Sequence, residues 1–223
     1  MNETPKSHLI VAIARAKGCG GGSIGMEVAR RLGCRYLDRE ILVEAARRMS
    51  RDPEALEAFD ERCMSFWERT MVLALGSPGA PVTPPPLTLD DRDLFHIEKA
   101  IMKEAAQRGP VVIVGRMGFA VFRGEPGLLS VFLHAPLKER VQSMMRVLGI
   151  ASEEEAKDLA LRTERDRDEF VKTYTGKVRL DAKNYHLCID TARFETDAVV
   201  GLICQAAQDV VRGLADPAAT EKP

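Results

Sequence analysis

A glycine-rich stretch near the N-terminus carries the first sign of chemistry. Residues 15–25 read Arg-Ala-Lys-Gly-Cys-Gly-Gly-Gly-Ser-Ile-Gly, after an apolar run at 8–14 and before a helical pattern with Ile24, Val28 and Leu32 on one face. A strand, a glycine turn and a helix N-terminus together offer backbone N–H groups to a phosphate. The Gly-Lys-Ser/Thr ending of an ordinary phosphate-binding loop is missing. A tight turn without a ligand therefore remains the alternative.

Charged and polar side chains also follow the other predicted strands, at Asp38-Arg39, Gly115-Arg116, His134 and Asp190-Thr191. The carboxyl ends of parallel strands meet at one edge of a sheet, where ligands bind. Guanidinium groups match phosphate oxygens in a bidentate fashion. The set therefore predicts a phosphate-handling site, although Arg116 could pair with a structural acid and Asp38 could cap a helix. His134 and His186 are expected to be structural.

Apolar runs and helical periodicity indicate the elements that would position these residues. The all-apolar runs 111–114 and 128–133 are typical of strands covered on both faces. The pattern predicts further strands at 8–14, 35–38 and 185–189, helices at 38–49, 52–75, 91–108, 136–148, 152–174 and 196–211, and a Pro- and Gly-rich loop at 76–86. Alternating strands and helices predict one α/β domain with a parallel sheet and helices on both faces. Its core would span about 8–214, followed by a flexible tail at 215–223.

The helix predicted at 152–174 is unusually rich in charge. It opens on Ser152-Glu-Glu-Glu155, which fits the Ser-x-x-Glu capping box. Its Arg and Asp residues, from Arg162 to Asp168, could form ion pairs one turn apart on a solvated helix. From periodicity alone, this solvated helix is the simpler interpretation.

Bulk composition narrows the partners and the compartment. The 223 residues carry a net charge of −1, which argues against sequence-independent binding to nucleic acid or an anionic membrane. No apolar run approaches the ~20 residues of a membrane span, and the N-terminus lacks a signal-peptide pattern, so a cytoplasmic protein is expected. The cysteines show no Cys-x-x-Cys spacing: Cys19, Cys34, Cys63, Cys188 and Cys204. Cys19 could have a lowered pKa at a helix N-terminus, or could simply fill a tight turn.

Several motifs in order along the chain resemble the cytidylate kinase-like family of the P-loop nucleoside monophosphate kinase fold. They are Arg15-x-x-Gly-x-Gly-Gly-Gly22, Tyr36-Leu-Asp-Arg-Glu-Ile41, Val112-Ile-Val-Gly-Arg116, Val131-Phe-Leu-His-Ala-Pro136, Tyr174-Thr-Gly176 and Asn184-Tyr185. The resemblance covers about residues 9–211. It implies a three-layer P-loop NTPase fold, with a parallel sheet between helices and a helical lid at about 152–180.

The resemblance also implies transfer of the γ-phosphate of ATP to a nucleoside monophosphate, with CMP or dCMP as first candidates and Mg²⁺ bridging the phosphates. The donor phosphates would be wrapped by Gly18, Cys19, Gly20, Gly21, Gly22 and Ser23, with Ser23 also contacting Mg²⁺. Asp38, Arg39 and Arg116 would bind the acceptor. Arg165 and Arg167 of the lid would close over the phosphates, with Arg162 as a further member, and Thr191–Phe194 would lie at the adenine.

The chain departs from the family pattern at the loop and beyond it. The slot of the usual lysine holds Gly21 or Gly22, and relatives that lack this lysine usually carry an arginine where this chain has Gly22. Arg15 or Lys17 could supply the missing positive charge. Other departures are Met117 after Gly-Arg, where authentic cytidylate kinases have aspartate, Glu164 where relatives tend to have aspartate, and the missing tryptophan after Thr-Gly. Two other functions therefore stay open: a kinase of another small acceptor, and a nucleotide-binding regulatory protein with weakened catalysis.

Overall fold

The computed structural model describes residues 8–38, 41 and 91–215. These residues form a five-stranded sheet in the order β2-β3-β1-β4-β5, with all neighbouring strands parallel. The strands are β1 (Ile10–Arg15), β2 (Arg35–Leu37), β3 (Val111–Val114), β4 (Leu128–His134) and β5 (Leu187–Asp190). The predicted parallel sheet is confirmed, although β5 begins two residues later than its apolar run.

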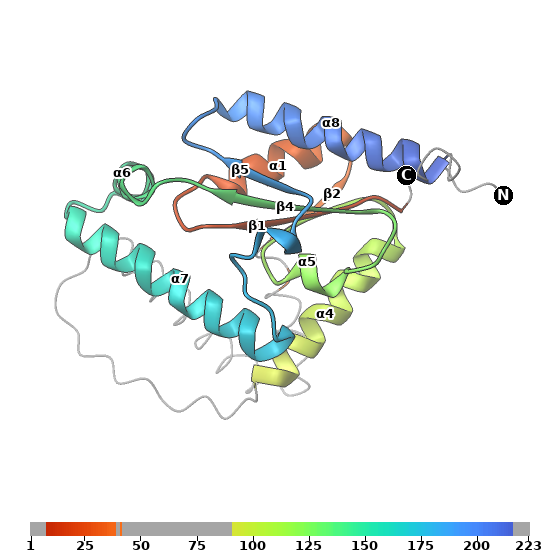
Figure 1. Ribbon diagram of the computed structural model, residues 1–223, viewed down its shortest axis with the longest axis horizontal. Coiled ribbons are helices and arrows are strands. Elements are labelled where there is room, and N and C mark those ends of the chain that lie inside the picture. The colour runs from red at the N-terminus through yellow and green to blue at the C-terminus, as the bar shows by residue number, and fades with distance from the viewer. Residues whose placement is uncertain (1–7, 39–40, 42–90, 216–223) are drawn as a thin grey trace, which may run out of the picture.

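Helices cover both faces of the sheet, as the sequence predicts (Figure 1). They are α1 (Gly21–Leu32), α4 (Asp91–Gln107), α5 (Gly118–Val121), α6 (Leu137–Leu148), α7 (Glu153–Thr175) and α8 (Thr196–Ala215), with a 3₁₀ turn at Ala182–Asn184. The short helix α5 was not predicted. Several predictions fall outside the described residues: the helix at 38–49 except for Asp38 and Ile41, the helix at 52–75, the loop at 76–86, Arg39 and Cys63.

The alternation of side chains along β1 explains the three layers. Val11 and Ile13 are buried in the core beneath α1 and α8, whereas Ile10 and Ala12 are buried in the core on the α4 face. Successive residues of a strand point to opposite faces of a sheet. A strand of apolar residues therefore stabilises the fold only when both of its faces are covered.

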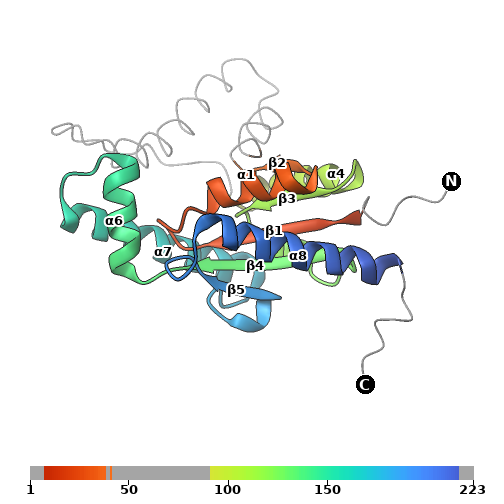
Figure 2. The same cartoon turned by 90° about the horizontal axis from the view of Figure 1, so that it is seen from above.

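Helices α6 and α7 extend beyond the carboxyl ends of the strands (Figure 2). They share a small core of their own, formed by Val141, Met144, Ile150, Ala156, Leu159 and Ala160. The Ser152 hydroxyl accepts a hydrogen bond from the Glu155 amide at 3.3 Å, as the capping pattern predicts. At the other end of α7, Val171 packs into an aromatic cluster with Phe95 and Phe132. Helix α7 is thus anchored at both ends, and its middle crosses the strand ends.

Among the described residues, α8 has the length and apolar composition of a membrane-crossing helix, with a mean hydropathy of 1.3. The sequence pattern predicts an amphipathic helix at 196–211 and no membrane span. A helix that covers a sheet can share these properties, and α8 places five buried residues in the core between itself and the sheet: Val199, Val200, Ile203, Cys204 and Ala207. Its last residue, Ala215, was predicted to belong to the tail.

Candidate phosphate-binding site

The glycine loop lies between β1 and α1, with an open helix N-terminus at its end. Gly18 and Gly20 have φ angles of +92° and +72°, which favour glycine. A β-carbon at Gly18 would lie 2.6 Å from the carbonyl oxygen of Arg140, so the loop packs closely on α6. Within α1, described throughout, no side chain caps the N-terminus and no acid lies in the first turn. The N–H groups of that turn lack partners within the helix and favour an anion.

The side chain of Arg15 occupies a slot made by two glycines. Arg15 is the last residue of β1, and a β-carbon at Gly21 would lie 2.8 Å from its Cγ. A β-carbon at Gly115, at the end of β3, would lie 3.1 Å from its Cζ. The guanidinium Nη2 is 3.4 Å from Oδ1 of Asp38. The two glycines therefore place a charged group beside the N-terminus of α1.

Two arginines influence each other's charge at this slot. Burial lowers the pKa of Arg15, and Asp38 opposes that shift. Arg167 reaches over from α7, where its Nη1 donates a hydrogen bond to the Arg15 carbonyl oxygen at 3.0 Å. Burial, and next the charge of Arg15, lower the pKa of Arg167 to about 9. Both groups remain positive at neutral pH, where nearby phosphate oxygens would offset their repulsion.

The three arginines predicted to act in the lid differ in their exposure. Arg167 is partly buried against the loop, whereas Arg162 and Arg165 are exposed on α7. The reason is helical geometry: Arg165 lies two residues from Arg167 and therefore on a different side of the helix. A contact of Arg165 with phosphates stays a prediction.

Three residues at the loop were not assigned a role from sequence. Glu164 Oε1 accepts a hydrogen bond from the Lys17 amide at 2.7 Å, and its Oε2 accepts one from Arg179 Nη2 at 2.6 Å. Arg140 Nη1 donates to the Lys17 carbonyl oxygen at 3.1 Å. Arg179 is buried, with 4% exposure, and its guanidinium lies 5.8 Å from the centre of the Phe132 ring. Neither Arg140 nor Arg179 belongs to a family motif. The one feature of the sequence that pointed to this cluster was Glu164, which stands where relatives tend to have aspartate.

The end of β3 holds Arg116 in a strained backbone conformation. Arg116 and Met117 have φ angles of +52° and +57°, which side-chain-bearing residues rarely adopt and which recur at functional sites. Nη1 of Arg116 lies 3.1 Å from Oε1 of Glu98, a fully buried residue of α4. Burial raises the pKa of Glu98, and Arg116 opposes the shift. Arg116 thus pairs with a structural acid, which was one of the two roles expected from sequence. A contact of Arg116 with an acceptor phosphate stays a prediction.

Asp38 and Ser23 lie at the first turn of α1. Asp38 Oδ2 accepts a hydrogen bond from the Tyr36 hydroxyl at 3.2 Å, and a β-carbon at Gly22 would lie 3.7 Å from the same oxygen. Ser23 is exposed, and its hydroxyl donates to the Gly20 carbonyl oxygen at 2.8 Å. The described residues contain no group of three or more His, Cys, Asp or Glu that could hold a metal. The exposed Ser23 hydroxyl still fits Mg²⁺, which takes few protein ligands when phosphates supply the rest.

Cys19 and Thr191 lie together behind the loop. The Cys19 thiol is buried and hydrogen-bonded with the Thr191 side chain, and burial raises its pKa to about 11. The lowered pKa that was one alternative for Cys19 is therefore wrong, and a small buried side chain in a tight turn is what the structure shows. Thr191 also donates to the His134 carbonyl oxygen at 3.2 Å. The Nδ1 of His186 accepts from the Ser130 amide, which fits the expected structural role.

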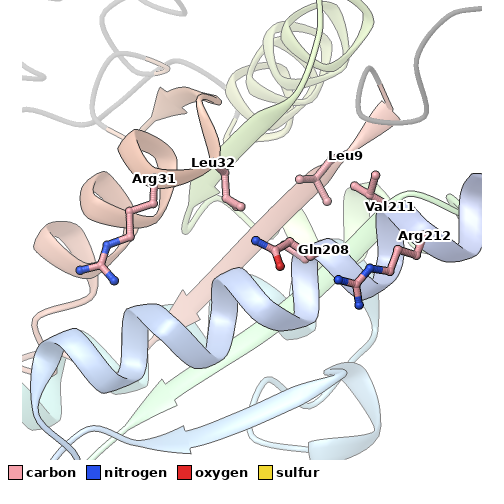
Figure 3. Close-up of a pocket in the computed structure, with 7 residues that line it drawn as sticks. Leu9, Arg31, Leu32, Gln208, Val211 and Arg212 are labelled. Atoms are coloured by element: carbon pink, nitrogen blue, oxygen red, sulfur yellow. The ribbon is translucent and has the colours of Figure 1, made fainter.

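A separate cavity of about 310 Å³ lies at the opposite, amino-terminal edge of the sheet (Figure 3). Its lining comes from α1, α8 and the residue before β1: Leu9, Arg31, Leu32, Ala207, Gln208, Val211 and Arg212. The surface is mostly apolar, and Arg31 and Arg212 are already paired with acids. The charged and polar residues described above lie at the opposite, carboxyl edge of the sheet.

The parallel sheet between helices and the glycine loop at its carboxyl edge define a three-layer α/β protein of the P-loop fold. The chain belongs to the cytidylate kinase-like family, whose profile matches residues 10–193. The resemblance inferred from the motifs is thereby confirmed.

Relatives of known name match over part of their length. A cytidylate kinase of Methanopyrus kandleri is 30% identical over 123 residues, which are 52% of this chain and 63% of the relative. A cytidylate kinase of Thermococcus kodakarensis is 32% identical over 120 residues, which are 53% of this chain and 60% of the relative. The match therefore spans less than two thirds of each relative.

Solved structures show the same fold at low identity. An uncharacterized protein from Eubacterium ventriosum is 19% identical with a TM-score of 0.67, covering 91% of this chain and 99% of that protein. Shikimate kinase from Bacteroides thetaiotaomicron is 13% identical with a TM-score of 0.51, covering 92% and 98%. These likenesses support the P-loop fold.

Proposed function

We propose that this protein is a kinase that transfers the γ-phosphoryl group of ATP to a nucleoside monophosphate, with CMP or dCMP as the first candidate. One observation carries the proposal: the Arg15 guanidinium lies in a two-glycine slot beside the uncapped N-terminus of α1, and Arg167 of the lid reaches over it. Family membership and relatives named cytidylate kinase support the nucleotide acceptor.

The donor side of the proposed site is the loop and α1. The backbone from Gly18 to Ser23 would bind the donor phosphates, while Arg15 and Lys17 would supply the charge of the missing loop lysine. The Ser23 hydroxyl would hold Mg²⁺, which, when bound, neutralises phosphate charge. Arg167 would stabilise charge on the transferred group and exclude water, since phosphoryl transfer depends on positioning and electrostatics. Thr191, behind the loop, would adjoin the adenine.

The acceptor side is the proposed task of Asp38, Arg39 and Arg116. Asp38 and Arg116 follow the neighbouring strands β2 and β3, at the same edge as the loop. That edge is where an acceptor phosphate would have to meet the donor for in-line transfer. The described cysteines are free thiols, which supports the cytoplasm as the proposed location.

A second candidate function is nucleotide binding with little turnover. Gly22 stands where relatives usually carry a loop arginine, so the first turn of α1 has no cation of its own at that position. A kinase with another small acceptor is the remaining enzyme alternative.

A coupled ADP-release assay with CMP, dCMP, UMP, AMP and no acceptor separates these functions. Turnover that depends on CMP or dCMP is the expected result. Acceptor-dependent turnover without preference for CMP would contradict the proposed acceptor, and ATP binding without any turnover would favour the regulatory function.

A further inference from the structure

The middle of the lid helix is joined to the glycine loop through one carboxylate. Glu164 lies near the centre of α7 and is 15% exposed. Its Oε1 accepts the amide N–H of Lys17 at 2.7 Å. That amide directly precedes the backbone proposed to bind the donor phosphates, Gly18 to Ser23. A lid residue thus supplies the negative oxygen to which such an amide can otherwise donate on a ligand.

Three guanidinium groups surround the same carboxylate. Arg179 Nη2 lies 2.6 Å from Oε2, while Nη1 of Arg167 and Nη1 of Arg140 lie 3.7 Å and 3.9 Å from Oε1. One negative charge therefore faces three positive charges and an N–H donor. Such a set of donors also suits the oxygens of a phosphoryl group, which carries more negative charge than a carboxylate.

Each of these arginines is also held by a second acceptor. Arg140 donates to the carbonyl oxygen of Lys17, Arg167 donates to that of Arg15, and Arg179 Nε donates to Asp168 at 2.6 Å. Helix α7 is anchored at both ends by the small core with α6 and by the aromatic cluster. The donors would therefore keep their places if the Glu164 side chain alone moved away.

We propose that Glu164 is an internal anion: a positioning residue that holds α7 on the glycine loop in the ligand-free chain and competes with a ligand phosphoryl group for these donors. This inference rests on the proposed phosphate chemistry of the loop. Phosphate binding then displaces the carboxylate from Lys17 and the arginines, so that Glu164 weakens ligand affinity while keeping the empty site ordered.

The test compares binding of inorganic tripolyphosphate to the full chain and its variants by titration calorimetry at fixed ionic strength. Glu164→Gln removes the charge with little change of shape and is expected to tighten binding roughly tenfold. Glu164→Asp keeps the charge and is expected to stay within about twofold of the parent. Glu169→Gln, at an exposed position of the same helix, is the matched control and is expected to change nothing. Melting curves confirm that each variant is folded.

Hydrogen exchange supplies a second readout at the loop. In Glu164→Ala, the segment 16–20 is expected to exchange faster than in Glu169→Ala, because the Lys17 amide loses its acceptor; tripolyphosphate is expected to restore protection. If Glu164→Gln binds tripolyphosphate as weakly as the parent, or more weakly, the internal anion is refuted while the proposed function stands. If neither protein binds tripolyphosphate, the phosphate chemistry of the loop is refuted as well.

Discussion

Arg167 and Arg15 are joined by a hydrogen bond of 3.0 Å from the lid guanidinium to the carbonyl oxygen that ends β1. Both residues were predicted from sequence, one in the loop and one in the lid. The contact is to the Arg15 backbone, and the positive charge of the Arg15 side chain is near enough to contribute to the lowered pKa of Arg167. A phosphate ligand would relieve that repulsion, so the relationship favours an anion between lid and loop.

The first prediction concerns the positive charge of the loop. Replacing Arg15 and Lys17 together by Ala is expected to lower kcat/KM for ATP by at least roughly 100-fold, the order seen when an electrostatic donor is lost. Arg30→Ala, on the exposed face of α1, is the control and is expected to change kcat/KM less than about twofold. Steady-state kinetics and ATP titration measure both. Unchanged kinetics in the double variant would show that the loop is a tight turn without a role in ATP binding.

The second prediction uses two adjacent glycines of α1. Gly21→Ala would press its β-carbon against Cγ and Cβ of Arg15 at 2.8 and 2.9 Å, so we expect a loss of about 1–3 kcal/mol of stability and a displaced guanidinium. At Gly22 the nearest atoms lie at 3.7 and 3.9 Å, and Ala there is expected to stabilise α1 by about 0.5 kcal/mol. Urea unfolding measures both. An equal change in the free energy of unfolding for the two variants would contradict the placement of the Arg15 side chain against Gly21.

The third prediction concerns the acceptor. Arg116→Ala is expected to abolish acceptor-dependent turnover while leaving ATP binding nearly intact. It also leaves Glu98 buried without its cation, at a cost of roughly 3 kcal/mol. The double variant Arg116→Ala with Glu98→Gln removes the unpaired charge, so stability recovers while turnover stays lost. Restored turnover in the double variant would mean that Arg116 serves only the ion pair.

The fourth prediction is a pH dependence of stability. Burial raises the pKa of Glu98 above its ordinary value of 4.5, so the folded chain binds this proton more tightly than the unfolded chain. The contribution of Glu98 to the free energy of unfolding therefore falls as pH rises from about 4.5 through the folded-state pKa. Glu98→Gln cannot titrate, and its stability relative to the parent is expected to rise over that window. Parallel stability curves from urea unfolding at several pH values would contradict this expectation.

The fifth prediction distinguishes two cysteines. Burial raises the pKa of both thiols, that of Cys19 to about 11, but Cys19 is buried and Cys188 is exposed to the reagent. Iodoacetamide at pH 8 is expected to alkylate Cys188 in the folded chain and Cys19 only after denaturation, because the thiolate is the reactive form. Peptide mass spectrometry measures both sites. Labelling of Cys19 at the rate of Cys188 would show a reactive thiol in the loop.

Much of the architecture could be read from local pattern. The all-apolar runs of β3 and β4 predicted strands covered on both faces, and the capping box of Ser152 predicted the start of α7. The glycines at 18 and 20 predicted a turn, since residues with a β-carbon resist those φ angles. The short helix α5 escaped prediction, because four residues are too few for a helical period to show.

What the sequence by itself determined was the order of the elements, the family and the presence of a glycine loop with arginines at strand ends, because these depend on patterns between near neighbours. The tertiary structure decided which polar groups meet: Arg116 with Glu98, and Glu164 with Arg179 and the backbone amide of Lys17. Those partners come from different elements, and ion pairs depend on distances of a few ångströms that only packing sets. The tertiary structure thus gave a loop without its usual lysine a partly buried slot for Arg15.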